Sequence, residues 1–490
     1  MANTQVSNKP FKPSILQALL PILFLIVALF INVRIFGDAA LDGSNQIILM
    51  LSAGVASIVA IRLGYKWKKI RSSIVKSISS ALSSIIILLL IGSLAGTWLL
   101  SGVVPAMIYY GLQVLNPTIF LVAATIVCAI VSIATGSSWT TAATVGIALI
   151  GIGTALGLKP GMVAGAIISG AYFGDKMSPL SDTTNLAPAM VGTDLFTHIR
   201  YMAYTTVPSI TITLIIFLII GLMQDSSEST TSTLDILDAI NGSFYISPEL
   251  FIVPIVVVIM IVRKIPAIPA IMFGALLGGI FAAIFQPEAI LSVSGYETLS
   301  AEAYYVGIMK AFYGDIQIVT GQEIVDDLLT SGGMYGMLGT VWLIVSAMIF
   351  GGVMEGTGML RRIAKSIISI VNSTGSLVAS TAGTCVFFNI TASDQYLAIV
   401  VPGRMYTDTY KEKGLALENL SRTLEDSGTV TSALVPWNTC GAYHANVLGV
   451  ATFAYLPFAF FNLISPFMTI FYAYMGIKIR ALKDAKTELN

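Results

Sequence analysis

Long apolar stretches separated by short charged segments run along almost the whole chain. No Asp, Glu, Lys or Arg occurs between Ser77 and Leu158, and none occurs between Ser427 and Ile477. Because about 20 apolar residues in a helix already cross the hydrocarbon core of a bilayer, each of these stretches must cross or enter the membrane more than once. The pattern predicts an all-α polytopic membrane protein.

The charged segments divide the apolar sequence into about ten expected spans. These spans cover residues 15–33, 47–63, 78–99, 162–190, 202–223, 250–262, 265–285, 334–356, 424–443 and 447–475. Around them we expect a cytoplasmic tail (1–14), a first transmembrane half (15–223), a connecting region (224–333), a second transmembrane half (334–475) and a second cytoplasmic tail (476–490).

Four segments depart from the pattern of a regular span. Residues 118–158 and 374–403 each carry a polar cluster at their middle, and spans 162–190 and 424–443 are interrupted by Gly, Pro and hydroxyl residues. Irregular polar backbone is tolerated at membrane depth only where it is buried in protein or lines a watery cavity. We therefore expect the first two segments to form re-entrant helical hairpins and the other two to form broken helices.

The placement of charge orients these segments in the membrane. Basic residues cluster in segments that the ten-span count places on one side, whereas the loops 224–247 and 286–333 are acidic. Cytoplasmic loops carry an excess of Lys and Arg, which places both termini inside. The first hairpin then opens outward and the second opens inward. The expected location is a bacterial cell membrane.

Composition excludes several classes of protein. With 56% hydrophobic and 11% charged residues, the chain lacks the polar surface of a soluble domain. The net charge is zero, so no global field predicts a nucleic-acid partner. The three cysteines have no CxxC spacing and are expected to be small buried side chains. Only two histidines and no nucleophile–base arrangement are present, so we expect neither an enzyme nor a cofactor.

The two halves resemble each other as an internal repeat. Thr135 at the middle of the first hairpin matches Thr391 in the second, 256 positions later, and Asp175 matches Asp426 at a separation of 251. The charge pattern gives the halves opposite orientations, so the expected architecture is two inverted repeats, each with a hairpin and a broken helix. Such repeats place the substrate site at their interface, near the middle of the membrane.

The first broken helix carries acidic residues within the string GDKMSPLSDTTNLAP, residues 174–188. Pro179 and Pro188 each disfavour helix before them, so we expect the chain to be unwound between them. Freed carbonyls, hydroxyls and carboxylates suit Na⁺, a hard cation, and an ionisable residue at this depth is functional by default. The alternative is that these acids only cap a half-helix. The candidate binding residues are Asp175, Ser178, Asp182, Thr183 and Asn185, with Asp182 and Asn185 as direct Na⁺ ligands.

The second broken helix and the two hairpin tips offer a matching set of oxygens. From the broken helix the candidates are Glu425, Asp426, Ser427, Thr429, Asn438 and Thr439, with Asp426 as a third Na⁺ ligand. From the tips they are Ser137, Ser138, Thr391, Ser393 and Asp394. Lys176 is expected to pair with Asp175, and Arg422 is placed to neutralise one of the acids beside it. His444 either relays protons or is a buried histidine with satisfied hydrogen bonds.

Two strings, GDKMSPLSDTTNLAP and SRTLEDSGTVTSALVPWNTCGAY, resemble the signature regions of the NhaC-type Na⁺/H⁺ antiporters, and GSLAGTWLLSG also resembles that family. The similarity runs from about residue 15 to about residue 475. It implies membership of a broader ion-transporter superfamily with hairpin and broken-helix repeats, and Na⁺ efflux driven by H⁺ uptake. The matching positions are Asp175, Ser178, Asp182, Thr183, Asn185, Glu425, Asp426, Ser427, Thr429, Asn438 and Thr439.

The leading hypothesis is therefore a secondary Na⁺/H⁺ antiporter that works by alternating access, in which one carboxylate holds either Na⁺ or H⁺. The second hypothesis is a Na⁺- or H⁺-coupled carrier of a small organic anion, because half-helix N-termini and hydroxyl-rich tips can hold negative charge. Two hairpins that close from opposite faces argue against an open channel. The expected partners are Na⁺, H⁺ and the lipid bilayer, with a small organic solute as the alternative cargo; a homodimer is compatible with the sequence.

Overall fold

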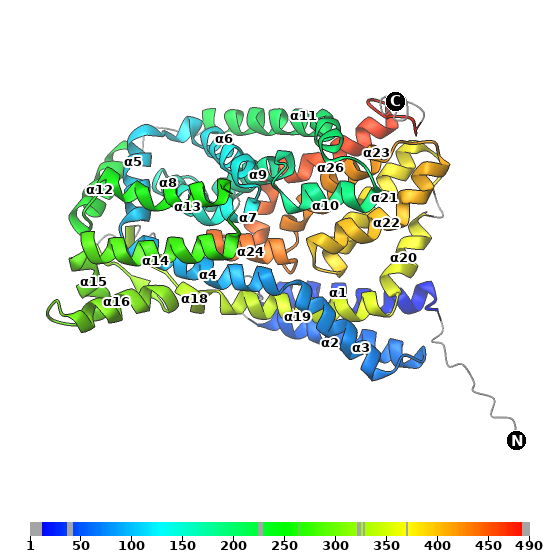
Figure 1. Cartoon of the computed structure of the whole chain (residues 1–490), viewed down its shortest axis with the longest axis horizontal. Helices are drawn as coiled ribbons and strands as arrows, with labels where there is room; N and C mark the ends of the chain where they lie inside the picture. The colour runs from blue at the N-terminus through cyan, green and yellow to red at the C-terminus, as the bar shows by residue number, and fades with distance from the viewer. Residues whose placement is uncertain are drawn as a thin grey trace, which may run out of the picture.

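Helices form nearly all of the described chain in the computed structural model of the protein (Figure 1). The structure describes residues 12–36, 43–223, 229–263, 265–320, 325–326, 329–368 and 371–482. Most of the expected N-terminal tail (1–14) and the end of the expected C-terminal tail (476–490) lie outside these residues. The predicted all-α membrane fold is confirmed.

The first half of the chain contains eleven α-helices and one π-helical segment among the described residues. They are α1 (Ile15–Phe36), α2 (Ser44–Arg62), α3 (Trp67–Ser80), α4 (Leu82–Leu100), α5 (Val103–Val114), α6 (Pro117–Thr135), α7 (Ser138–Thr141), η2 (Ala142–Gly146), α8 (Ile147–Ala155), α9 (Pro160–Met177), α10 (Asp182–Val191) and α11 (Leu195–Leu222).

The connecting region is also mainly helical. Its described elements are α12 (Ser229–Ser243), η3 (Pro248–Phe251), α13 (Ile252–Val262), α14 (Ala267–Phe285), α15 (Pro287–Ser294), α16 (Ala301–Tyr313), β1 (Ile316–Gln317), β2 (Thr330–Ser331) and α18 (Gly333–Gly336). The two short strands pair antiparallel, with Ile316 opposite Ser331.

The second half repeats the sequence of hairpin and broken helix. Its elements are α19 (Leu338–Gly356), α20 (Met359–Ile368), α21 (Thr374–Thr391), α22 (Gln395–Glu412), α23 (Glu418–Leu424), η4 (Glu425–Thr429), η5 (Val430–Leu434), α24 (Thr439–Leu448), α25 (Thr452–Tyr455), η6 (Leu456–Phe458) and α26 (Phe460–Tyr474).

Eight helices of the described chain are long and apolar enough to span a membrane, and two bent helix pairs raise the number to ten. The number agrees with the ten spans expected from the sequence, but some of the helices that qualify are not the segments that were expected to be spans. Both arms of the first hairpin qualify as spans, whereas no piece of either broken helix does. The bent pairs are α12 with η3 and α13 at 85°, and α25 and η6 with α26 at 56°.

Each hairpin consists of two helices joined by a short tip. In the first, α6 ends at Thr135, the next residue Gly136 has a φ of +70° that favours glycine, and Ser137 caps the start of α7. In the second, Ser393 has a φ of 59° and Asp394 caps α22. The second arm, α22, continues to Glu412, nine residues beyond the expected end of the hairpin at 403. Figure 1 shows the two hairpins entering from opposite ends of the molecule.

The broken helices are interrupted by four residues each. The first break covers 178–181, between α9 and α10, and the second covers 435–438, between η5 and α24. The expected unwinding between Pro179 and Pro188 is wrong in its second part, because Pro188 lies inside α10. Only Pro179 falls in the break. The Ser181 hydroxyl accepts the backbone N–H of Thr184, which begins the helix six residues before Pro188.

Helix starts give the register of the repeat. Helices α4 and α19 begin 256 positions apart, and α6 and α21, like α10 and α24, begin 257 apart. The helix caps agree, since Ser181 caps α10 and Asn438 caps α24. At this separation Asp175 corresponds to Ser432, so the expected match of Asp175 with Asp426 is wrong. Two Gly- and Ser-rich strings align well at several sequence offsets, whereas the capped ends of corresponding helices align at only one offset.

Small residues bring the first hairpin close to the first broken helix. A side chain at Gly170 of α9 would clash with the backbone carbonyl of Thr125 on α6. Next to this contact, the Ser132 hydroxyl of α6 donates to the carbonyl of Ala171 at 2.6 Å. Close backbone approach and interhelical hydrogen bonds are typical of helix packing in membranes. This packing fixes the hairpin tip against the break in α9–α10.

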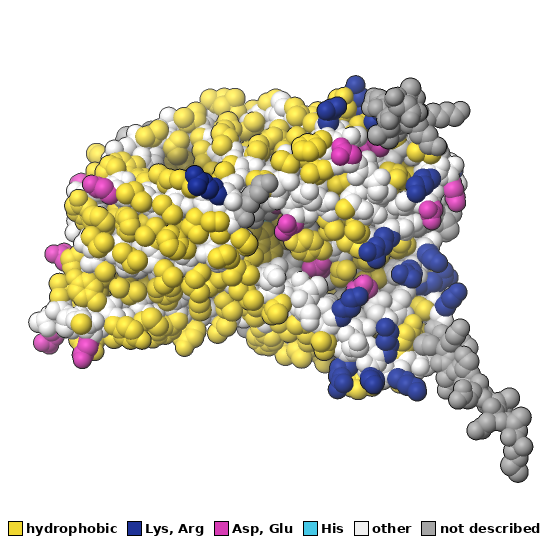
Figure 2. Space-filling model, in the orientation of Figure 1, with side chains coloured by type: hydrophobic (Ala, Val, Ile, Leu, Met, Phe, Trp, Pro, Cys, Tyr) yellow, Lys and Arg dark blue, Asp and Glu magenta, His cyan; other side chains and the backbone are white. Residues whose placement is uncertain are grey.

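Basic side chains gather at one end of the molecule, around α3 and α20 (Figure 2). Helix α20 is strongly amphipathic, with Met359 and Ile363 buried and Arg361, Arg362 and Lys365 exposed. A wide apolar band covers the neighbouring surface in the same view. By the positive-inside rule, this excess of positive charge predicts that this end faces the cytoplasm.

Gly170→Val should therefore destabilise the protein strongly, because the added side chain would push α9 away from α6. Overpacking of this kind costs about 1–3 kcal/mol. The matched control is Gly383→Val on α21, where no atom lies within 4 Å of an added Cβ. Thermal unfolding of both purified variants measures the effect. Equal unfolding temperatures in the two variants would contradict the packing described above.

Candidate ion-binding site

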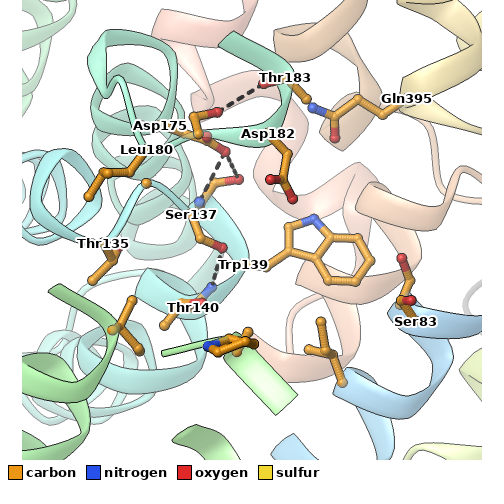
Figure 3. Close-up of a pocket in the computed structure, with 18 of the residues that line it drawn as sticks. Ser83, Thr135, Ser137, Trp139, Thr140, Asp175, Leu180, Asp182, Thr183 and Gln395 are labelled. Carbon is orange, nitrogen blue, oxygen red and sulfur yellow. Dashed lines mark hydrogen bonds between the residues drawn. The ribbon is translucent and has the colours of Figure 1, made fainter. Parts of the chain in front are cut away.

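A cavity of about 520 Å³ lies where the two hairpin tips meet the two broken helices (Figure 3). Five helices of the described chain contribute their first residue to its lining: Ala267 of α14, Ser138 of α7, Asp182 of α10, Gln395 of α22 and Thr439 of α24. The last four form two repeat-related pairs, each 257 positions apart. The partial positive charge of a helix N-terminus favours negative charge nearby, so these four ends stabilise acidic groups in the cavity.

Asp175 connects the first broken helix to the first hairpin tip. Its side chain is almost completely buried, and its Oδ2 accepts the Ser138 backbone N–H at 3.0 Å and the Ser138 hydroxyl at 2.6 Å. The Ser137 hydroxyl in turn accepts the backbone N–H of Thr140 at 3.1 Å. The tip is therefore held in place by an acidic side chain that also lines the cavity.

Asp182 is the exposed acid of the cavity. It is the first residue of α10, and Figure 3 shows its carboxylate directed into the space beside the Trp139 indole. The next side chain, Thr183, is buried and shares a 3.2 Å hydrogen bond with the Ser181 hydroxyl. Among the described residues that line the cavity, Asp175 and Asp182 are the acids, and Lys, Arg and His do not occur. The lining therefore attracts cations.

Both hairpin tips are attached to α24. The Trp139 and Tyr443 rings stack with centroids 3.9 Å apart, and the Tyr443 hydroxyl donates to the Trp139 carbonyl at 2.9 Å. At the second tip, the Ser393 carbonyl accepts the Thr439 backbone N–H at 3.1 Å. The two tips thus share one helix as their partner. They line the same cavity, as expected for hairpins that approach each other across a polar space.

Most residues of the cavity lining were absent from the set predicted from sequence, among them Trp139, Gln395, Tyr396 and Cys440. Gln395 and Cys440 interact directly, because the Cys440 thiol donates to the Gln395 side-chain oxygen at 2.6 Å. Gln395 and Cys440 each lie one residue beyond a predicted position, Asp394 and Thr439. A rule that counts the residue after each helix cap would have found Gln395. The aromatic positions carry no comparable signal in a single sequence.

The three predicted Na⁺ ligands lie in different surroundings. Asp182 faces the cavity, whereas the Asn185 amide donates to the carbonyls of Pro179 and Ser181 at 2.8 and 2.7 Å and so closes the break. Asp426 forms a buried ion pair with Lys176. Within the described residues, no group of three or more His, Cys, Asp or Glu side chains is arranged to hold a metal ion.

Two expected pairings of charge are wrong. Lys176 contacts Asp426 of the opposite repeat instead of the neighbouring Asp175. Arg422 does not neutralise the acids that follow it. Its guanidinium lies 4.8 Å from the centre of the Tyr201 ring, and it donates to the Lys478 carbonyl at 3.2 Å. The first outcome follows from the position of Lys176 at the end of α9, where its side chain reaches η4 of the second broken helix.

The remaining predicted residues mostly serve local structure. Asp394 accepts the Leu397 backbone N–H at 2.8 Å, Thr391 donates to the Phe387 carbonyl at 2.7 Å, and Ser178 donates to the Ile133 carbonyl at 2.7 Å. Asn438 donates to Asn389 at 3.1 Å.

Buried polar groups without a hydrogen-bond partner lie near the second broken helix. Glu425, Ser427 and Thr429 are fully buried, and their side-chain oxygens have no such partner among the described residues. The same holds for both ring nitrogens of His444, so the expectation of a satisfied histidine is wrong.

Comparison with known proteins gives independent information on the family of this chain. The model of the Na⁺/H⁺ antiporter family matches residues 170–477. The Na⁺/H⁺ antiporter NhaC of Alkalihalophilus pseudofirmus is 40% identical over 428 residues, which cover 87% of this chain and 89% of that protein. The chain belongs to the Na⁺/H⁺ antiporter family. It is a secondary transporter and not an enzyme.

Other members of the family carry different names. The malate-2H⁺/Na⁺-lactate antiporter of Bacillus subtilis is 37% identical, with 93% of this transporter and 95% of that protein covered. The arginine/ornithine antiporter ArcD of Halobacterium salinarum is 34% identical, with 96% and 93% covered. Since these identities are close to that of the NhaC relative, overall similarity does not decide the cargo.

The geometry of the cavity predicts that Asp182→Cys reacts rapidly with a water-soluble maleimide in the folded transporter, because the side chain at this position is exposed. Ser432→Cys, at a fully buried position, is the matched control and should stay unmodified. The native Cys128, Cys385 and Cys440 are buried and should add little background. Intact-mass spectrometry counts the labels. Slow labelling of Asp182→Cys, at the rate of the control, would exclude an open cavity at α10.

Proposed function

We propose that the transporter exchanges Na⁺ for H⁺ across a bacterial cell membrane by alternating access. The observation that carries the proposal is the charge of the cavity: its described lining contains two carboxylates and no basic side chain. Carboxylate and hydroxyl oxygens are the ligands that a hard cation prefers. The proposed binding residues are Asp175, Asp182, Ser138 and Thr183, which lie together at the first hairpin tip and the first break.

Competition for the same oxygens couples the two ions. A carboxylate that holds a proton has lost the charge that attracts Na⁺, and a carboxylate that coordinates Na⁺ is a poor base. Asp182 suits this role because its side chain is exposed to the cavity and can exchange both ions with water. Asp175 already accepts two hydrogen bonds from Ser138, so ion binding beside it is linked to the position of the hairpin tip.

Alternating access follows from the placement of the hairpins. The first and second hairpins enter from opposite ends of the molecule, and their tips line one cavity (Figure 1). Movement of one tip away from α24 would open the cavity toward one side while the other tip keeps the opposite side closed. The exchange then needs no continuous pore.

Exchange of a small organic anion is the second candidate function. The four repeat-related helix N-termini around the cavity favour negative charge, and relatives named for malate, lactate and arginine show similar identity. Two carboxylates without a basic partner oppose an anion more strongly, because like charges repel at short range in a site of low dielectric. The cavity therefore supports Na⁺/H⁺ exchange better.

Asp182→Asn should abolish Na⁺-driven proton flux, because the amide keeps the size of the side chain and removes the charge that Na⁺ and H⁺ share. The control is Asp235→Asn on the exposed face of α12, which should transport like the unmodified protein. Proteoliposomes loaded with a pH-sensitive dye report the flux after a Na⁺ jump, with and without malate, lactate, arginine or ornithine. If flux depends strictly on one of these solutes, or if Asp182→Asn transports normally, Na⁺/H⁺ exchange at Asp182 is wrong.

A further inference from the structure

The two broken helices are joined by a buried ion pair outside the cavity. Lys176, in the last turn of α9, contacts Asp426 on η4, and both side chains are completely buried. Neither residue belongs to the cavity lining. The pair connects the two repeats through their interrupted helices.

Other oxygens complete the surroundings of this ion pair. The Lys176 ammonium donates to the Ser465 hydroxyl at 3.1 Å, and Ser465 also lies 3.3 Å from Oδ1 of Asp426. The second carboxylate oxygen of Asp426 accepts the Thr205 hydroxyl at 2.8 Å. The ammonium is also 5.6 Å from the centre of the Phe461 ring. A carboxylate and a hydroxyl around one positive charge form the kind of oxygen site that holds a monovalent metal cation.

Stability alone does not account for such a pair. Removal of two charges from water costs several kcal/mol per ion, and a packed apolar pair in the same place is often as stable or more stable. Helices α9 and α26 already pack through apolar contacts, such as that between the Phe173 and Phe461 rings at 5.9 Å. We therefore expect the charge on Lys176 to have a role besides holding the helices together.

We propose that the Lys176 ammonium is a tethered cation that fills a second cation site, centred on Asp426, so that one Na⁺ site in the cavity remains free. The inference rests on the proposed Na⁺/H⁺ exchange, because it takes Na⁺ as the competing ion. It also explains why Asp426, which suits Na⁺ by residue type and position, is closed to the cavity. The lysine limits the number of Na⁺ ions that each protomer binds.

Lys176→Met tests the proposal directly, because methionine has a similar length and shape but no charge. The Asp426 carboxylate and the Ser465 hydroxyl then remain without their cation. Equilibrium binding of radiolabelled Na⁺ to the purified transporter should show one equivalent for the unmodified protein and a second equivalent for Lys176→Met. Lys176→Arg keeps the positive charge and should bind one equivalent.

The double variant Lys176→Met with Asp426→Asn is the matched control. It lacks both charges, so it should fold and bind one equivalent of Na⁺, the one in the cavity. If Lys176→Met also binds one equivalent, Asp426 is not a cation site and the proposal is wrong. Addition of Asp182→Asn to each protein removes the cavity site separately. Na⁺ binding that survives Asp182→Asn in the otherwise unmodified transporter would overturn the proposed function without bearing on the comparison at Lys176.

Recovery of Lys176→Met provides a second readout if the variant is unstable. A cation site at Asp426 predicts that the folded variant is recovered, and its unfolding temperature raised, in NaCl but not in choline chloride. If the ion pair is purely structural, the yield and the unfolding temperature of the variant should fall equally in both salts, and that result would overturn the proposal.

Discussion

A helix that is interrupted at membrane depth leaves backbone groups that no water or lipid can satisfy, and the whole site depends on how the protein meets this requirement. Each interruption has its own polar side chain. Ser137 and Ser181 cap the helices of the first repeat, and Asp394 and Asn438 cap those of the second. The same caps direct four helix N-termini at one cavity. One arrangement of helix caps thus satisfies the backbone hydrogen bonds and forms the cavity that is proposed to bind the ion.

The second requirement is that the interruptions stay aligned with the hairpin tips. Close backbone contact between α6 and α9 at Gly170 sets the first tip beside the first break, and the Asp175 hydrogen bonds to Ser138 hold it there. Stacking of Trp139 on Tyr443 then ties this unit to α24. Continuous contacts therefore connect the packing of α6 on α9 to the acidic side chains that face the cavity.

Much of the fold and of the candidate site could be predicted from the sequence, because hairpin tips, helix breaks and acids at membrane depth have local signatures. Pro179 marks a helix break, and Asp182 is an acid at membrane depth. Contacts between distant elements have no such signature. The contact of Lys176 on α9 with Asp426 on η4 and the stacking of Trp139 on Tyr443 of α24 depend on how distant elements are placed in the fold. The register of the repeat also needed the helix caps, since short Gly- and Ser-rich strings align almost equally well at several offsets.

The two repeats share their register but have divided the chemistry between them. Asp182 and its counterpart Thr439 both face the cavity, and Asp175 corresponds to Ser432, so the cavity acids belong to the first repeat alone. The charge that attracts an ion therefore lies in the first repeat, while the second repeat supplies neutral walls. A fold built from two equivalent halves has in this way become chemically asymmetric: one half carries the charge of the site and the other carries the uncharged surface opposite it.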